Sequence, residues 1–216
     1  MTSRRYFLAL AAASLLGMAG IAWSQPAVLD QLLKETDKGD AQAVAVLLDR
    51  GADPNSTDLT GSTLLMIAAR QGHDAVVKLL IDRKADLARR SPSGDSALML
   101  ASLKGHLGSV KLLVDRGAPL SHPGWAPLLY AAYEGRAEGV RFLLDRGADK
   151  NALAPNGYSA LMLAARGGFA DATRILLYED VDVTIKSYDG NTALKIARSR
   201  KEAELEELLK RAGAFE

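Results

Sequence analysis

The sequence predicts an all-α solenoid of about six helix-turn-helix repeats joined by β-turn loops, and two observations predict it. The first is a repeated segment: LLDRGAD stands at residues 47–53 and again at 143–149, with similar segments between and after these copies. The second is a fixed period, because the glycine position of this segment recurs at intervals of 33, 33, 30 and 33 residues. A period of this length is typical of stacked repeats that each form one supersecondary unit. The recurring positions hold Gly51, Lys84, Gly117, Gly147 and Asp180.

The second unit shows how one period forms two helices. Thr63 is a favourable N-cap residue for a short helix over 64–71, and Gly72 is placed to end that helix. A second helix is predicted over 73–82, because its apolar residues recur at helical spacing on one face. These residues are Val76, Val77, Leu79, Leu80 and Ile81.

The residue that follows each second helix is expected to take the left-handed conformation that closes a helix. Glycine suits this position, whereas the Cβ atoms of Lys84 and Asp180 should cost roughly 1 kcal/mol each. Asp-Arg pairs precede the position at 49–50, 82–83, 115–116 and 145–146. They are expected to form a solvated, charge-balanced edge in which each pair contributes little to stability.

The segment TGSTLLMIAARQGHDAVVKLLIDRKAD at 60–86 resembles the ankyrin repeat, whose pattern runs from a turn through Thr-Pro-Leu-His, Ala-Ala, Gly-His, Val-Val and Leu-Leu to Gly-Ala-Asp. The resemblance extends over one domain, 25–216, with repeats at about 26–54, 55–88, 89–120, 121–151, 152–184 and 185–216. One departure is systematic, because the histidine of Thr-Pro-Leu-His is missing from every unit. We expect apolar packing in its place, by Met66, Met99, Leu129 and Met162.

The first 24 residues have the layout of a signal peptide. Two arginines precede an apolar run over 7–23, and small residues stand before an expected cleavage site after Ser24. The start SRRYFL resembles the twin-arginine export motif, with Arg4 and Arg5 as the pair. An uncleaved anchor is the alternative, although a run of this length is at the short limit for crossing a bilayer. Export would place the protein in the bacterial periplasm or outside the cell, with no membrane attachment after cleavage.

The overall charge gives no reason to expect a nucleic-acid partner. The chain has 27 Lys and Arg against 26 Asp and Glu. Arg4 and Arg5 are the only charged residues before position 25, so residues 25–216 carry 25 basic and 26 acidic residues, a net charge of −1. Such a balance provides no electrostatic footprint for nucleic acid or for an anionic membrane. The absence of cysteine excludes disulfides, thiolate metal sites and cysteine nucleophiles.

No catalytic or cofactor motif is present in the sequence. Phosphate-binding loops, dinucleotide fingerprints and nucleophile elbows are absent. His73 and His106 occupy the Gly-His position of the resemblance and are interpreted as structural. The column of Met66, Met99 and Met162 could suggest Cu(I), but repeats stacked about 8–10 Å apart keep two sulfurs from one ion. We therefore expect no cofactor, no metal and no enzymatic activity.

The resemblance implies a concave surface, formed by the turns and by the exposed side of each first helix, that binds other proteins. Tyrosine, tryptophan and arginine are enriched in binding hot spots, and several of them fall on this surface in neighbouring repeats. The candidate partner-binding residues are Arg70, Leu103, Lys104, Trp125, Tyr133, Glu134, Tyr158, Arg166 and Tyr188.

Trp125 lies in the unit that is three residues short, so a truncated turn and a notch beside the indole are expected. Two interpretations of Trp125 remain open: it is exposed for binding, or it folds down to fill the space left by the short turn. Tyr158 and Tyr188, at turn tips, are less easily explained as core residues.

The expected function is that of a monomeric, non-catalytic scaffold that holds one or more periplasmic proteins on the concave face. Two alternatives stand beside it. One is an accessory factor that protects a periplasmic redox or metal enzyme, because the twin-arginine route carries folded chains, often with cofactors. The other, less favoured, is an enzyme built on a repeat scaffold.

Overall fold

A computed structural model describes residues 26–215, and this part of the chain contains twelve α-helices and no β-strand beyond two isolated bridges. The helices form six consecutive pairs. The first helices of the pairs are α2 (Pro26–Lys38), α4 (Leu64–Gln71), α6 (Ala97–Lys104), α8 (Pro127–Tyr133), α10 (Ala160–Gly167) and α12 (Ala193–Ser199). The second helices are α3 (Ala41–Asp49), α5 (Asp74–Asp82), α7 (Leu107–Asp115), α9 (Ala137–Asp145), α11 (Ala170–Tyr178) and α13 (Ala203–Arg211).

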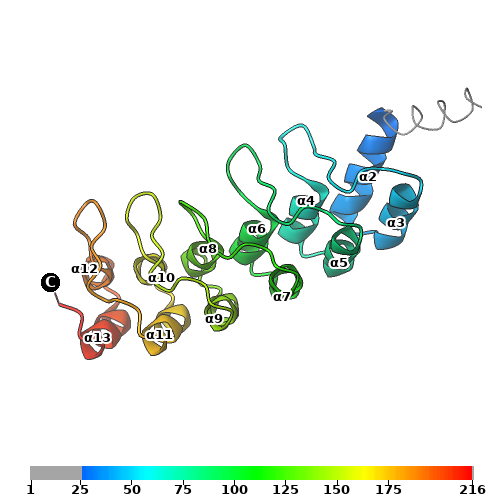
Figure 1. The fold of residues 1–216 in the computed structure, drawn as a ribbon. Helices are drawn as coiled ribbons and strands as arrows, with labels where there is room; N and C mark the ends of the chain where they lie inside the picture. The colour runs from blue at the N-terminus through cyan, green and yellow to red at the C-terminus, as the bar shows by residue number, and fades with distance from the viewer. Residues whose placement is uncertain (1–25, 216) are drawn as a thin grey trace, which may run out of the picture.

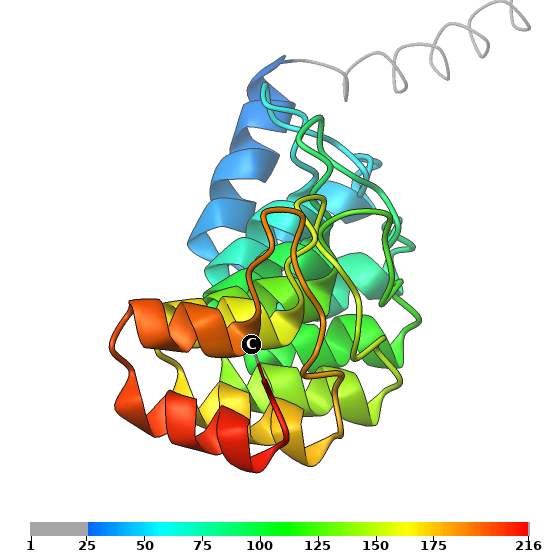
Figure 2. The same cartoon turned by 90° about the vertical axis from the view of Figure 1, so that its left-hand side faces the viewer.

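The pairs stack side by side in two layers, one made of the first helices and the other of the second helices (Figure 1). The loops that lead into the first helices project away from the second layer as a row of fingers, which is also visible along the stack in Figure 2. We call each loop a finger and number it by the repeat whose first helix it precedes. The helices and their order are those of the predicted solenoid.

Four of the six first helices begin where a hydroxyl caps them, as predicted for Thr63. The Thr63 side chain accepts a hydrogen bond from the backbone N–H of Met66, and Gly72 ends α4 with φ +76°. Ser96, Ser159 and Thr192 cap α6, α10 and α12 in the same way. Helix α8 has no capping side chain at Ala126, but Pro127 at its first position loses no hydrogen bond there.

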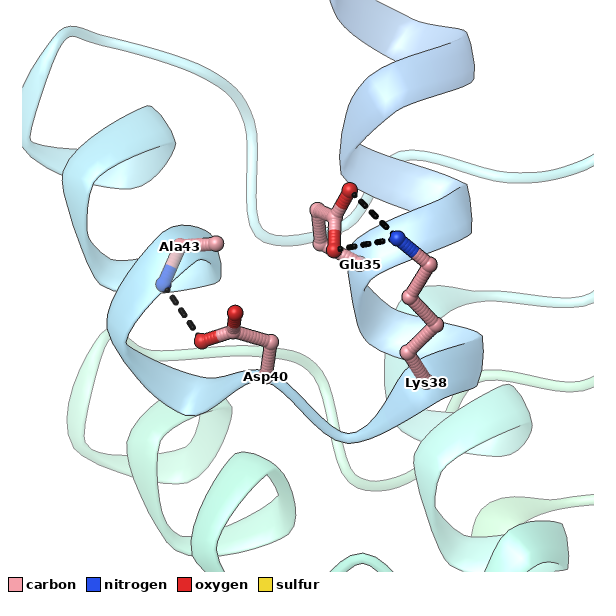
Figure 3. Close-up of polar contacts among 4 residues, drawn as sticks. All are labelled: Glu35, Lys38, Asp40 and Ala43. Carbon is pink, nitrogen blue, oxygen red and sulfur yellow. Dashed lines mark hydrogen bonds and ion pairs between the residues drawn. The ribbon is translucent and has the colours of Figure 1, made fainter.

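In the first repeat, carboxylates stabilise the turn between α2 and α3 (Figure 3). Near the end of α2, the Lys38 ammonium donates to both carboxylate oxygens of Glu35, at 3.1 Å. Asp40 then caps α3 by accepting a 2.9 Å hydrogen bond from the backbone N–H of Ala43. The turn between the two helices is therefore stabilised within itself.

The residues that stand where the Thr-Pro-Leu-His pattern has its histidine are buried, as the sequence indicated. Met66, Met99 and Met162 are each 1% exposed, and Leu129 is fully buried. Two methionines add a weak polar contact, because the N–H groups of Thr63 and Ser96 donate to the sulfurs of Met66 and Met99 at 3.4 Å. Apolar packing thus fills this column in the first-helix layer.

Neighbouring repeats are also joined at the turn between the two helices of each pair. The His73 imidazole covers Gly39 of the preceding repeat, and its Nε2 lies 2.8 Å from the carbonyl oxygen of Asp37. His106 covers Gly72 in the same way, with Nε2 3.1 Å from the Arg70 carbonyl oxygen. Both histidines therefore have the structural place that the sequence indicated. Arg136, Phe169 and Glu202 occupy the equivalent place in later repeats.

The Asp-Arg pairs form a ladder that runs between repeats rather than within each pair. Arg83 bonds Asp49 of the preceding repeat at 2.8 Å, and Arg116 bonds Asp82 at 2.8 Å. Hydrogen bonds from Lys78 and Arg116 lower the pKa of Asp82 to about 2. Each of these side chains is substantially exposed, so each pair adds little to stability.

The left-handed positions after the second helices are occupied as predicted. Gly51, Gly117 and Gly147 have φ values of +97°, +87° and +85°, and Lys84 and Asp180 adopt +65° and +54° despite their Cβ atoms.

The expected export segment, residues 1–24 with Arg4 and Arg5, lies outside the described residues. Within 26–215, no helix has both the length and the apolar character needed to cross a bilayer.

Candidate functional site

The candidate face consists of the fingers and of the exposed ends of α4, α6, α8, α10 and α12. Finger 4 is its irregular point. This finger, which precedes α8, is narrower than the fingers beside it (Figure 1). A cavity of about 200 Å³ lies at its base, between the finger residues 120–124 and Asp149, Ala152 and Leu153 of the following repeat. The shortened turn therefore leaves a hollow, although Trp125 does not line it.

Trp125 packs into an aromatic cluster with two tyrosines of α8. Its ring centroid lies 5.1 Å from that of Tyr130 and 5.8 Å from that of Tyr133, the second pair meeting edge to face. The indole is half-buried and contacts the hydrophobic core. Trp125 thus neither stands free nor fills the hollow under finger 4, because two aromatic rings hold it over α8. We call Trp125, Tyr130 and Tyr133 the aromatic cluster.

Tyr130 anchors this cluster to the neighbouring finger. Its hydroxyl donates a 2.5 Å hydrogen bond to the Asp95 carboxylate in finger 3. Burial, together with the hydrogen bond to Asp95, raises the pKa of Tyr130 above its ordinary range, so the phenol remains protonated and donating. The Asp95 charge is balanced by the guanidinium of Arg90, which also donates to the Gly94 carbonyl at 2.8 Å. The truncated finger 4 is therefore tied to finger 3 through a side-chain network.

Sequence reasoning did not identify Tyr130 or Arg90. The repeat register contains the signal for Tyr130, because the equivalent positions hold apolar residues: Ile67, Leu100, Leu163 and Ile196. A tyrosine in an otherwise aliphatic column needs a partner for its hydroxyl when partly buried. Identifying Asp95 as that partner requires the distance between two fingers, which the register does not provide.

Tyr133 is the exposed member of the aromatic cluster. Its side chain is 43% exposed, while its edge-to-face contact with Trp125 limits the orientations that its ring can adopt. An aromatic ring that is ordered before binding loses little conformational freedom when a partner covers it.

Tyr158 and Arg166 are the predicted residues of the fifth repeat on the candidate face. The Arg166 guanidinium lies 6.0 Å from the centroid of the Tyr158 ring, within the range of a cation–π contact. Tyr158 is half-buried against the core, which corrects the expectation that it stands free at a turn tip. Arg166 at the end of α10 remains exposed.

Tyr188 does stand free. It is 80% exposed at finger 6, and its backbone N–H donates to the Asn156 carbonyl oxygen of finger 5 at 3.2 Å. Its ring also lies close to Gly157, where a Cβ would approach it to 2.9 Å. The backbone of Tyr188 is therefore fixed while its ring faces solvent.

The remaining predicted residues lie along the same row of helix ends. Arg70 and Leu103 are half-buried near the ends of α4 and α6, and Lys104 is exposed. Glu134, just after α8, makes a long ion pair of 3.8 Å with Arg136. The structure places all four on the candidate face and brings Glu134 next to Tyr133 and Arg166.

A second cavity, of about 220 Å³, is the place where these residues converge. It is lined by Tyr133 and Glu134 of the fourth repeat, by Leu163, Arg166, Gly167 and Phe169 of the fifth, and by Arg200 of the sixth. Phe169 and Arg200 were not among the predicted residues. We call this hollow the arginine cavity, after Arg166 and Arg200. Across residues 26–215, no cluster of three or more histidine, cysteine or acidic residues has the arrangement of a metal site.

Comparison with known proteins agrees with this architecture. Residues 32–123, 89–154 and 128–215 match a family model described as ankyrin repeats (3 copies). A crystal structure of an ankyrin repeat domain from Acinetobacter baumannii AYE is similar, with a TM-score of 0.77 and 30% sequence identity. The similarity covers 85% of this chain and 98% of that one. Curated protein sequences gave no match.

Proposed function

Because the chain belongs to the ankyrin-repeat family, we propose that it is a non-catalytic scaffold that holds a partner protein on the candidate face, with repeats three to five at the centre. Ankyrin repeats generally mediate binding to other proteins. In the family, the surface made by fingers and first helices is the concave one, and the candidate face of this chain corresponds to it.

The aromatic cluster is the observation that carries this proposal. It combines one exposed ring, Tyr133, with two partly buried rings that hold it in place. Hot spots of protein interfaces are enriched in tyrosine, tryptophan and arginine, and they lie where a rigid anchor is surrounded by other contacts. Arg166 and Tyr188 in the following repeats supply such surroundings.

The test is affinity capture with the mature chain, residues 25–216, and two variants. Tyr133→Ser/Tyr188→Ser removes exposed rings from the candidate face. Tyr178→Ser is the matched control, because Tyr178 is 81% exposed but belongs to α11, in the layer of second helices. We expect a periplasmic protein to be retained by the native chain and by Tyr178→Ser, and at least tenfold less by the double variant, a loss of about 1.4 kcal/mol or more.

The thermal unfolding midpoints of the three proteins must agree before retention is compared. A loss of retention then reflects the changed surface and not a destabilised fold. Equal retention by all three chains would move the binding site away from the candidate face. Retention of nothing by the native chain would contradict the scaffold function itself.

We further propose that this scaffold acts as a monomer in the bacterial periplasm. The support for the location is the signal-peptide layout of residues 1–24 and the Arg4-Arg5 pair in a twin-arginine-like start. A route that carries folded chains would suit a repeat protein whose helices pack mainly against their sequence neighbours.

A further inference from the structure

The arginine cavity brings together two cations from different repeats. Arg166 stands in the last turn of α10 and Arg200 directly follows α12, and both line the same hollow of about 220 Å³. Both side chains are exposed. Cations near helix C-termini are favoured by the helix dipole, which accounts for either arginine by itself. The dipole does not account for two of them lining one cavity, where like charges repel.

Neither arginine is neutralised within the described part of the chain. Among residues 26–215, no carboxylate lies within ion-pair distance of Arg166 or Arg200. Glu134 is the one acidic residue that lines the cavity, and its ion pair is with Arg136. The Glu202 carboxylate lies over Gly168, outside the cavity lining. The cavity therefore keeps a local excess of positive charge.

This excess is local, since the chain from residue 25 onward has a net charge of −1. Lys186 and Lys195 of the last repeat line a separate cavity of about 360 Å³, and neither has an ion-pair partner among the described residues. A near-neutral molecule that lines one cavity with two unpaired guanidinium groups presents there a surface complementary to negative charge.

We propose that the arginine cavity binds an acidic segment of the partner protein, with aspartate or glutamate carboxylates on Arg166 and Arg200. This inference rests on the proposed scaffold function and adds the chemistry of the partner. Guanidinium groups pair with carboxylates through charge-assisted and often bidentate hydrogen bonds. Tyr133, Leu163 and Phe169 form the apolar part of the cavity lining, so an apolar residue beside the acidic ones completes the match.

The experiment is selection of displayed random peptides on immobilised residues 25–216, which contain all six helix pairs. The native chain, Arg166→Gln/Arg200→Gln and Lys111→Gln/Arg141→Gln are compared. The last is the matched control, because it removes two positive charges from the exposed face of the second-helix layer. Peptides selected by the native chain and by the control should be enriched in Asp and Glu. Their affinity should fall by tenfold or more on the Arg166→Gln/Arg200→Gln chain and decrease with added salt.

The outcomes separate this inference from the scaffold function. Selected peptides that bind the Tyr133→Ser/Tyr188→Ser chain less tightly than the native chain, but lack an excess of acidic residues, would overturn the acidic-segment proposal and leave the scaffold function standing. An equal loss of affinity in the Lys111→Gln/Arg141→Gln control would show that binding depends on the overall charge of the chain and not on the arginine cavity. This result would also overturn the acidic-segment proposal. So would displacement of the peptides by a short DNA duplex more readily than by poly-L-glutamate. Failure to select any peptide would count against both proposals.

Discussion

At the residue scale, the backbone position after each second helix shows how the repeat tolerates exceptions. The six equivalent positions, including Gly213 after α13, have φ between +54° and +97°, and four of them hold glycine. The backbone therefore keeps one conformation whatever the side chain. In Lys84 the N–H still donates to the Ile81 carbonyl at 3.0 Å, so the hydrogen bond that closes the helix is retained. The Cβ atoms of Lys84 and Asp180 are the source of strain.

Replacing Lys84 and Asp180 by glycine should stabilise the protein. Each change removes a Cβ from a left-handed position, which is expected to contribute about 1 kcal/mol, partly offset by the greater freedom of glycine in the unfolded chain. Thermal unfolding of Lys84→Gly and Asp180→Gly should therefore show a higher midpoint for each. The reciprocal change Gly117→Lys should lower it, since Gly117 has no neighbouring atom within 4 Å and reports the backbone alone. A lower midpoint for both glycine variants would refute the strain argument.

At the element scale, packing between repeats is uneven where α6 and α7 of the third repeat meet the start of α9. Gly139 stands inside α9, where the other five repeats have Ala43, Val76, Ser109, Ala172 and Leu205. It lines a cavity of about 210 Å³ together with Ser102 of α6, whose hydroxyl is buried without a hydrogen-bond partner. A glycine inside a helix is less favourable than alanine by about 1 kcal/mol. This element therefore combines a weak helix position with unfilled space.

Gly139→Ala should raise the stability of the fold by about 1 kcal/mol. The nearest atoms to the added Cβ would be Cβ of Arg136 at 3.6 Å and Cβ of Ala131 at 3.8 Å, which are ordinary contacts. Gly167→Ala is the contrasting change. It gains the same helix propensity in α10, but the new methyl would overlap the Phe169 ring. Thermal unfolding should thus move in opposite directions for the two variants, and a shared direction would show that helix propensity alone decides both.

At the scale of the whole molecule, the stack is built from contacts between neighbours. The first helices pack in sequence from α2 to α12, the second helices do the same, and fingers and turns join each repeat to the next (Figures 1 and 2). Such a solenoid is extended and presents one continuous face to a partner. Terminal repeats cover the ends, and α13 at the C-terminal end has a strongly charged outer surface.

The destination of the whole chain can be tested through its first residues. If the Arg4-Arg5 pair directs export, the double variant Arg4→Lys/Arg5→Lys should remain in the cell interior, while the native chain is recovered from the periplasmic fraction without residues 1–24. Immunoblotting of cell fractions measures both location and size. Unchanged export of the double variant would assign the chain to the general secretory route, and a full-length chain in the membrane fraction would favour an uncleaved anchor.

The sequence by itself determined the repeat period, the caps of the first helices and the left-handed positions, because each depends on residues close together in the chain. Thr63, Gly72 and Lys84 illustrate this, since their conformations follow from local hydrogen bonding and backbone sterics. The family resemblance placed the candidate face, and the register placed Tyr133 and Arg166 on it.

Only the tertiary structure decided what these side chains touch. The Trp125 indole lies on Tyr130 and Tyr133, the Tyr130 hydroxyl reaches Asp95 in another finger, and Arg200 lines a cavity with Arg166. The second and third of these contacts join residues about one repeat apart, and all three depend on how far each finger projects and on how each side chain is oriented. A shortened finger changes its own reach and the orientation of its side chains. How far they change is decided by packing between residues of different repeats, and the repeat period alone does not specify that packing.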